Sequence, residues 1–186
     1  MREACLSGLT VQNSRQSLEE IAGKDVVERA LATLPDAERD QYLSVGPDSW
    51  LPVRIADEVQ RAVAREAGIP VGEFAGFVRA FSHRSIERMV STVWKVLLRF
   101  TSDKALVERT PELFAHTYNV GHLTATVDEP GHGTVTLDEW PDISDEQMIG
   151  TAAGIEAVLQ TAGRKNVAIR WQRTATGVSY AVTWSA

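Results

Sequence analysis

Hydrophobic and polar residues alternate at every second position in four stretches near the C-terminal end of the chain. The stretches cover residues 122–128, 134–140, 166–173 and 178–184. A period of two is typical of a β-strand with one buried and one solvated face. A glycine-containing turn joins the first stretch to the second, and another joins the third to the fourth. The pattern therefore predicts two β-hairpins.

A helix is predicted between the two hairpins. Apolar residues recur there at helical spacing, at Met148, Ala152, Ile155, Leu159 and Ala162. Ser144 stands three residues before Gln147, the spacing of a capping box in which each side chain binds the other residue's backbone N–H. The small residues Gly150 and Gly154 would let another element approach this helix closely.

Residues 1–120 carry helical spacings interrupted by Gly and Pro. We expect helices over 14–22, 25–34, 50–67 and 73–100, and two short helices between 102 and 118; residues 9–12 fit a short strand or an extended arm equally well. The predicted fold class is α+β, with an N-terminal helical layer packed on a C-terminal four-stranded antiparallel sheet of ββαββ order. One domain covers residues 1–186, with a mainly helical part (1–120) and a ββαββ part (121–186).

Composition narrows the function classes. The net charge is −6 and the pI about 5.3, which argues against a nucleic-acid partner or an anionic membrane surface. Cys5 is the single cysteine, so neither an intrachain disulfide nor a cysteine metal site can form. The chain has no apolar run of membrane length and no signal-peptide pattern. We therefore expect a cytoplasmic protein.

Several segments together resemble a family of uncharacterised soluble proteins of about this length that is abundant in myxobacteria. The matching segments are 31–35, 48–52, 110–114, 118–121, 140–141, 154–156, 162–163 and 177–184. The second half is also similar, more distantly, to the 4-vinyl-reductase-type small-molecule-binding domain and to the haem nitric-oxide/oxygen-binding fold. Both resemblances imply helices over an antiparallel sheet with a ligand held between them.

The sequence departs from both patterns at the residues that hold a cofactor. The vinyl-reductase type has cysteines near its end, where this chain has Arg173 and Ala181. The haem fold uses a helix histidine on the iron and a Tyr-x-Ser-x-Arg signature, which the stretch from Tyr118 to His122 does not match. We therefore expect no haem, and the cofactor stays unknown.

No metal site is predicted. His83 is interpreted as a helix-end or surface residue rather than an iron ligand, because no partner stands at ligand spacing. His116, His122 and His132 match no zinc template. The acidic residues between 128 and 146 are favourable at a helix N-terminus and are interpreted as a solvated rim rather than a calcium site.

Aromatic and apolar residues of both halves supply the candidate ligand site. Binding pockets are mostly apolar with a few polar groups, although any one of these residues is more typical of an ordinary core. The predicted pocket residues are Phe77, Phe81, Met89, Trp94, Trp171, Tyr180 and Trp184.

The sequence contains no nucleophile elbow, Walker loop or dinucleotide fingerprint, so an enzyme is the less favoured interpretation. The leading hypothesis is a non-enzymatic sensory or adaptor module that binds a small apolar ligand between helices and sheet and signals through a protein partner. A homodimer is compatible with it. The alternatives are an enzyme or carrier in tetrapyrrole metabolism, of the haem or bacteriochlorophyll type, and a purely structural protein-interaction domain.

Overall fold

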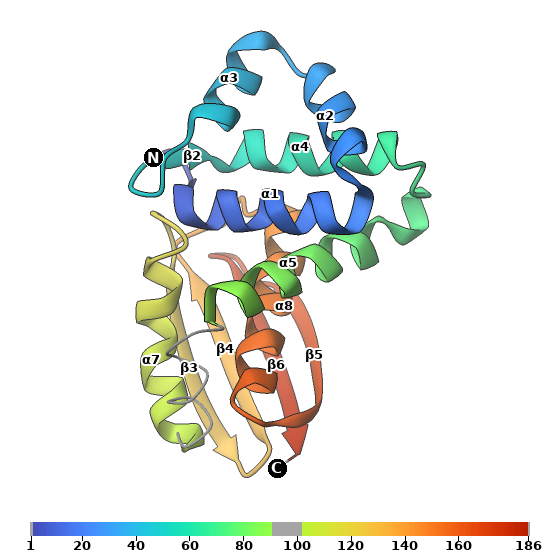
Figure 1. Ribbon diagram of the computed structural model, residues 1–186. Helices are drawn as coiled ribbons and strands as arrows, with labels where there is room; N and C mark the ends of the chain where they lie inside the picture. Colours follow the sequence, from blue (N-terminus) through green and yellow to red (C-terminus); the bar gives the residue numbers. More distant parts are fainter. Residues whose placement is uncertain (1, 91–101, 186) are drawn as a thin grey trace.

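The computed structural model describes residues 2–90 and 102–185. Its N-terminal part is mainly helical (Figure 1). In chain order the elements are β1 (Cys5–Ser7), α1 (Gly8–Ala22), α2 (Lys24–Ala32), α3 (Asp36–Ser44), β2 (Trp50–Pro52), α4 (Val53–Glu66), the 3-10 helix η1 (Val71–Glu73) and α5 (Phe74–Val90).

The C-terminal part contains the predicted sheet. Its elements are α7 (Asp103–Ala115), β3 (His122–Glu129), β4 (His132–Asp138), α8 (Asp145–Thr161), β5 (Lys165–Arg173) and β6 (Val178–Ser185). The strands lie in the order β3-β4-β6-β5, and every neighbouring pair is antiparallel. The predicted α+β class, with a helical part followed by a four-stranded antiparallel sheet of ββαββ order, is confirmed.

One face of this sheet carries the core. Leu137, Val178 and Tyr180 are fully buried because they alternate with polar residues and point to the side that the helices cover. Figure 1 shows α7 and α8 over the sheet and α1 and α4 farther away, with α5 running between the two parts. The helical layer and the sheet thus share one apolar interior.

The contact between α5 and α8 holds the two parts together. A methyl group on Gly154 would lie 3.6 Å from Ile86 of α5, and one on Gly150 would lie 3.4 Å from Ser82, so the small residues do permit the close approach that was predicted. At the edge of this contact Arg79 binds both carboxylate oxygens of Glu156, at 2.8 and 2.9 Å.

The structure differs from the prediction at several elements. Residues 102–115 form one helix rather than two, because Pro111 lies inside α7 without ending it. The undecided segment 9–12 belongs to α1, and the strands β1 and β2 were not predicted; each has only three residues, too few for a periodic pattern. The predicted helix over 73–100 is seen from Phe74 to Val90, and its remainder lies outside the described residues.

The two outer strands of the sheet differ in their surroundings. Helix α7 packs along β3, whereas β5 is the outer strand on the other side. The pairing of β5 with β6 shifts register between Lys165 and Ala168, where Asn166 has a φ of 51°. Within the described residues no helix is long and apolar enough to cross a membrane.

Gly177→Ala should destabilise the protein by at least about 2 kcal/mol, because the added methyl group would lie only 2.0 Å from the Leu137 carbonyl oxygen. Gly76→Ala is the matched control. It lies inside α5 with no atom within 4 Å of the new methyl group, and it should stabilise by about 0.5–1 kcal/mol. Urea unfolding measures both changes, and equal effects would contradict the assigned turn geometry.

Candidate functional site

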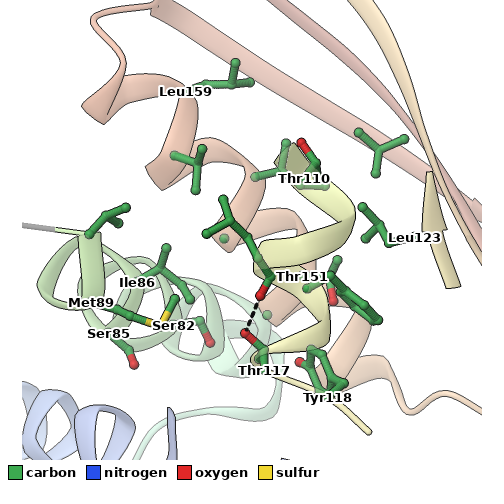
Figure 2. Close-up of a pocket in the computed structure, with 18 of the residues that line it drawn as sticks. Ser82, Ser85, Ile86, Met89, Thr110, Thr117, Tyr118, Leu123, Thr151 and Leu159 are labelled. Carbon is green, nitrogen blue, oxygen red and sulfur yellow. Dashed lines mark hydrogen bonds between the residues drawn. The ribbon is translucent and has the colours of Figure 1, made fainter. Parts of the chain in front are cut away.

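A cavity of about 160 Å³ lies between the helices and the covered face of the sheet (Figure 2). Helices α5, α7 and α8 and strands β3, β4 and β6 form its walls, and residues of α1, β1 and α4 contribute at the end near the N-terminal helices. An engineered cavity of about 150 Å³ in another protein takes up benzene. The space described here therefore suits a molecule of about that size.

Most of the lining is apolar, which is typical of a small-molecule site. The apolar side chains come from all three helices and from the sheet: Leu6, Phe81, Ile86, Met89, Val90, Leu106, Leu113, Phe114, Leu123, Ala125, Val135, Ile155, Val158, Leu159, Val182 and Trp184. Gly150 and Gly154 leave room on α8. Such a surface favours an apolar ligand body.

Among the described residues five threonines line the cavity, and the hydroxyls of Thr110, Thr117 and Thr151, labelled in Figure 2, are not equivalent. Thr110 donates its proton to the Leu106 carbonyl oxygen at 3.1 Å, one turn earlier in α7. Thr117 likewise donates to the Leu113 carbonyl oxygen at 3.3 Å. The buried Thr151 hydroxyl on α8 has no hydrogen bond of ordinary geometry to any described residue.

A chain of buried hydrogen bonds starts at the cavity and ends in the N-terminal helices. The Tyr118 hydroxyl donates to Gln147 Oε1 at 2.7 Å, and Gln147 Nε2 donates to Asp57 Oδ1 of α4. Gln147 and Tyr118 both line the cavity, whereas Asp57 does not. The Gln147 amide is thus the link between the ligand space and α4.

The same amide explains why the predicted capping box is only half formed. Ser144 accepts a hydrogen bond from the Gln147 backbone N–H at 3.3 Å, as expected of an N-cap residue. The Gln147 side chain does not return to the Ser144 backbone, because it is bound to Tyr118 and Asp57 instead.

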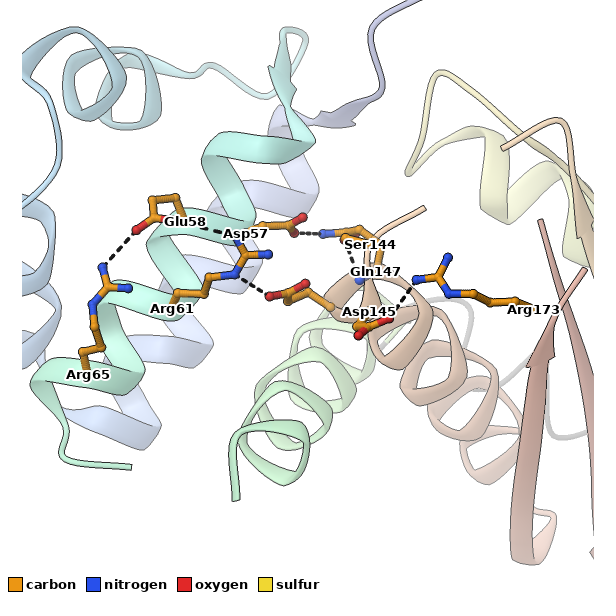
Figure 3. A network of polar contacts seen from close by, with 9 residues as sticks. Asp57, Glu58, Arg61, Arg65, Ser144, Asp145, Gln147 and Arg173 are labelled. Atoms are coloured by element: carbon orange, nitrogen blue, oxygen red, sulfur yellow. Dashed lines mark hydrogen bonds and ion pairs between the residues drawn. The ribbon is translucent and has the colours of Figure 1, made fainter. Parts of the chain in front are cut away.

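An ion pair lies beside this chain (Figure 3). Arg61 Nε donates to Glu146 Oε1 at 2.6 Å, and the Glu146 side chain is only 6% exposed. Glu58 binds Arg65 and lies near Arg61 on the same helix, while Asp145 binds Arg173 of β5. The first turn of α8 is therefore held to α4 on one side and to the sheet on the other.

Burial raises the pKa of the ionisable side chains in and beside this series of hydrogen bonds. It raises the pKa of the Asp57 carboxyl, and the hydrogen bonds from Gln147 and Ser144 offset only part of the rise. Burial also raises the pKa of the Tyr118 and Tyr180 phenols, against a smaller lowering by the Thr151 hydroxyl. Both tyrosines are therefore neutral at physiological pH and can act as hydrogen-bond donors.

The structure places the predicted pocket residues in different surroundings. Phe81, Met89 and Trp184 line the cavity. Phe77 packs on Phe81 with ring centroids 5.4 Å apart, and Tyr180 is fully buried with its hydroxyl on the Met148 carbonyl oxygen. Trp171 lies on β5 and is 42% exposed, and Trp94 lies outside the described residues.

The polar residues at the cavity were not predicted as site residues. The sequence indicates only a capping role for Gln147, places Asp57 on the outward face of its helix and gives Gln60 no role. The expectation for Asp57 is wrong, because Asp57 and Gln60 are both buried on α4. A polar residue at a helical core position was the available signal. His83 bonds Gln160 Oε1 at 3.0 Å, and all four histidines lie outside the described lining.

Solved structures of H-NOX proteins resemble this one over nearly the whole chain. An Fe(II)NO H-NOX protein from S. oneidensis has a TM-score of 0.72 at 12% identity, over 97% of this chain and 99% of that one. An unliganded Fe(II) H-NOX protein from K. algicida has a TM-score of 0.69 at 7% identity, over 97% of each chain. The chain has the H-NOX fold.

A third similar structure is an oxygen-binding H-NOX domain related to soluble guanylate cyclases, with a TM-score of 0.68 at 10% identity over 97% of this chain and 95% of that one. No protein-family model and no curated protein matches the sequence. At identities of this size the likeness establishes the architecture, including the helical part that precedes the sheet.

The expectation of no haem is corrected by these neighbours. They include H-NOX structures described by their Fe(II) state and others described by haem redox potential or haem distortion, so haem is the cofactor to which the fold points. The departures at the ligand positions led to the expectation, because local motifs were weighed more heavily than the shared architecture.

The described lining matches haem in character but not in size. It is apolar, and Met89 and Tyr118 are side chains of types that ligate haem iron in other proteins. Tyr118 is bound to Gln147 and its raised pKa disfavours the phenolate, which leaves the Met89 thioether. A porphyrin is several times larger than benzene, so it would enter only if helices and sheet moved apart.

Asp57→Asn should stabilise the protein at neutral pH and leave it unchanged below about pH 4. The raised folded-state pKa means that the folded protein holds this proton more tightly than the unfolded chain, whose Asp pKa is about 3.9. The free energy of unfolding of the parent therefore falls as the pH rises from the unfolded-state pKa of Asp57 to its higher folded-state pKa, by up to about 1.4 kcal/mol per pH unit. The asparagine keeps an acceptor for Gln147 and removes this loss.

Thermal unfolding of Asp57→Asn and the parent between pH 4 and pH 8 measures the effect. The exposed Asp142→Asn is the control and should run parallel to the parent at every pH. A constant difference between Asp57→Asn and the parent would contradict a raised pKa at Asp57.

Proposed function

We propose that this protein is a sensory module in which a small, mainly apolar molecule binds in the cavity between helices and sheet. The cavity carries this proposal: it is apolar, it lies in the interior of a fold shared with ligand-binding H-NOX proteins, and it is bordered by a buried polar chain that leads elsewhere. An ordinary core would have filled this space with side chains.

The buried hydrogen bonds from Tyr118 through Gln147 to Asp57 would carry the signal. A ligand that changes the position of Tyr118 or Gln147 acts on Asp57, because buried hydrogen bonds are costly to leave unmade. The ion pair between Arg61 and Glu146 connects the same two helices. Occupancy of the cavity would therefore alter how α4 and the helices on it are held.

The signal would pass to a protein partner in the cytoplasm through the N-terminal helices, with residues 1–186 acting as one domain. Of the predicted pocket residues we keep Phe81, Met89 and Trp184 as direct ligand contacts. Phe77 and Tyr180 would support them from behind.

Ala125→Leu should abolish binding of a benzene-sized probe. Ala125 lies on β3 at the cavity wall, and three additional carbon atoms would occupy much of the space. We expect toluene to bind the parent protein in isothermal titration calorimetry and to bind Ala125→Leu at least about tenfold more weakly.

The control for this experiment is Thr124→Leu, at the neighbouring exposed position on the opposite face of β3. It adds a leucine to the same strand without entering the cavity, so toluene affinity should stay at the parent value. Failure of toluene to bind the parent, or equal affinity in Ala125→Leu, would overturn the cavity as a ligand site.

Haem is the second candidate ligand, favoured by the described Met89 sulfur at the cavity wall and by the haem structures among the neighbours. When bound, haem supplies an iron centre that can take a diatomic gas. This chain would contribute the thioether and an apolar, water-excluding surface.

Titration with ferrous haem tests this candidate. We expect a Soret band that saturates at one haem per chain and that shifts in Met89→Leu, because loss of the sulfur changes the iron's ligands. Ile86→Leu, a neighbouring lining position without sulfur, is the control and should leave the band in place. A spectrum that stays that of free haem would remove haem as the ligand.

A further inference from the structure

Two buried polar atoms at the cavity have no hydrogen-bond partner within the described residues. They are Thr151 Oγ1 on α8 and Gln60 Oε1 on α4, and each residue is only 8% exposed. Leaving a buried polar atom unpaired costs about 1–3 kcal/mol, so such atoms call for an explanation.

The contrast with the other cavity threonines makes Thr151 informative. Thr110 and Thr117 donate to carbonyl oxygens of α7 one turn earlier, Thr10 bonds the Ser7 hydroxyl, and Thr126 donates to Asp128. The tyrosine hydroxyls near Thr151 donate elsewhere, Tyr118 to Gln147 and Tyr180 to the Met148 carbonyl oxygen. The Thr151 hydroxyl lies close enough to both phenols to lower their pKa, yet it makes no hydrogen bond of ordinary geometry to any described residue, so it is available to a ligand in the cavity.

Gln60 supplies an acceptor of the complementary kind. Gln60 lines the main cavity and also a second space of about 20 Å³ that reaches toward Tyr42 and Leu18. A space of that size holds one water molecule at most. The side chain is thus placed where a group entering from the main cavity can meet it.

Charge restricts the ligand further. The acidic side chains of the lining, Asp103 and Glu146, are each bound to an arginine, Arg164 and Arg61. The described lining contains no lysine or arginine that would neutralise an anionic ligand. An uncharged molecule therefore loses least on leaving water.

From these observations we infer that the ligand is a compact, uncharged ring compound bearing one hydroxyl group, of the phenol class, and that Thr151 and Gln60 recognise this group, because a hydroxyl both accepts and donates a hydrogen bond. The apolar walls contact the ring. Thr151 donates a hydrogen bond to the oxygen of the ligand hydroxyl, and Gln60 Oε1 accepts a hydrogen bond from the same hydroxyl. This inference rests on the proposed function, because it specifies which molecule enters the same cavity.

The experiment compares phenol with toluene, which has the same shape but cannot donate a hydrogen bond. Isothermal titration calorimetry on the full chain gives both affinities. Correcting for the different water solubilities through the transfer free energies of the two probes, we expect phenol to be preferred about 3- to 10-fold per hydrogen bond formed.

Thr151→Val and Gln60→Met, singly and combined, remove the two polar atoms at nearly constant volume. Each should lower the preference for phenol, and the combined variant should abolish it while toluene affinity stays within about twofold of the parent. Thr110→Val is the matched control. Its hydroxyl is already bound to Leu106, so its loss should leave the preference unchanged.

The outcomes separate the inference from the proposed function. If toluene binds and the combined variant still prefers phenol, the inference alone is overturned. Water or the neighbouring tyrosines would then satisfy Thr151 and Gln60. Failure of both probes to bind the parent overturns the cavity as a ligand site. Circular dichroism checks that the combined variant is folded.

Discussion

The buried amide of Gln147 is the constraint on which the arrangement of this protein depends. Its oxygen accepts a hydrogen bond from Tyr118, next to the sheet, and its nitrogen donates a hydrogen bond to Asp57, inside the helical layer. Because an amide has one acceptor and one donor end, it fixes the direction of both bonds and so the position of α8 relative to α4. The contacts of Gly150 and Gly154 then allow α8 to lie close to α5, and the cavity lies between these helices and the sheet.

Much of the fold could be predicted from the sequence, because its signals are local. Alternation along residues 122–184 places Leu137, Val178 and Tyr180 on one covered face, and the structure agrees. Signals that depend on tertiary pairing were missed. The strands β1 and β2 exist because Cys5–Ser7 and Trp50–Pro52 meet across the chain, and three-residue segments carry no period of their own. Pro111 indicates a second short helix in the sequence, whereas it lies inside the single helix α7, because the fixed φ of proline is compatible with a helix.

The candidate site was less predictable, for a physical reason. Apolar residues that line a cavity and those that fill a core obey the same periodicity, so Phe81 and Tyr180 look alike in the sequence although only Phe81 borders the space. The polar residues were the better indicator. Asp57 and Gln60 stand on the buried stripe of α4, and Thr151 shares a face of α8 with Gln147. Asp57 meets Gln147 from another helix, and no spacing rule connects residues so far apart.

The outer strand β5 has a consequence for self-association. An unpaired strand edge is a template on which a second molecule can extend the sheet. Here the register shift at Lys165–Ala168 and the left-handed backbone of Asn166 interrupt the regular ladder, and Arg170 and Arg173 place positive charge along the same strand. Two copies meeting edge to edge would bring these like charges together across a distorted ribbon. The β5 edge is thus protected against extension of the sheet by a second copy.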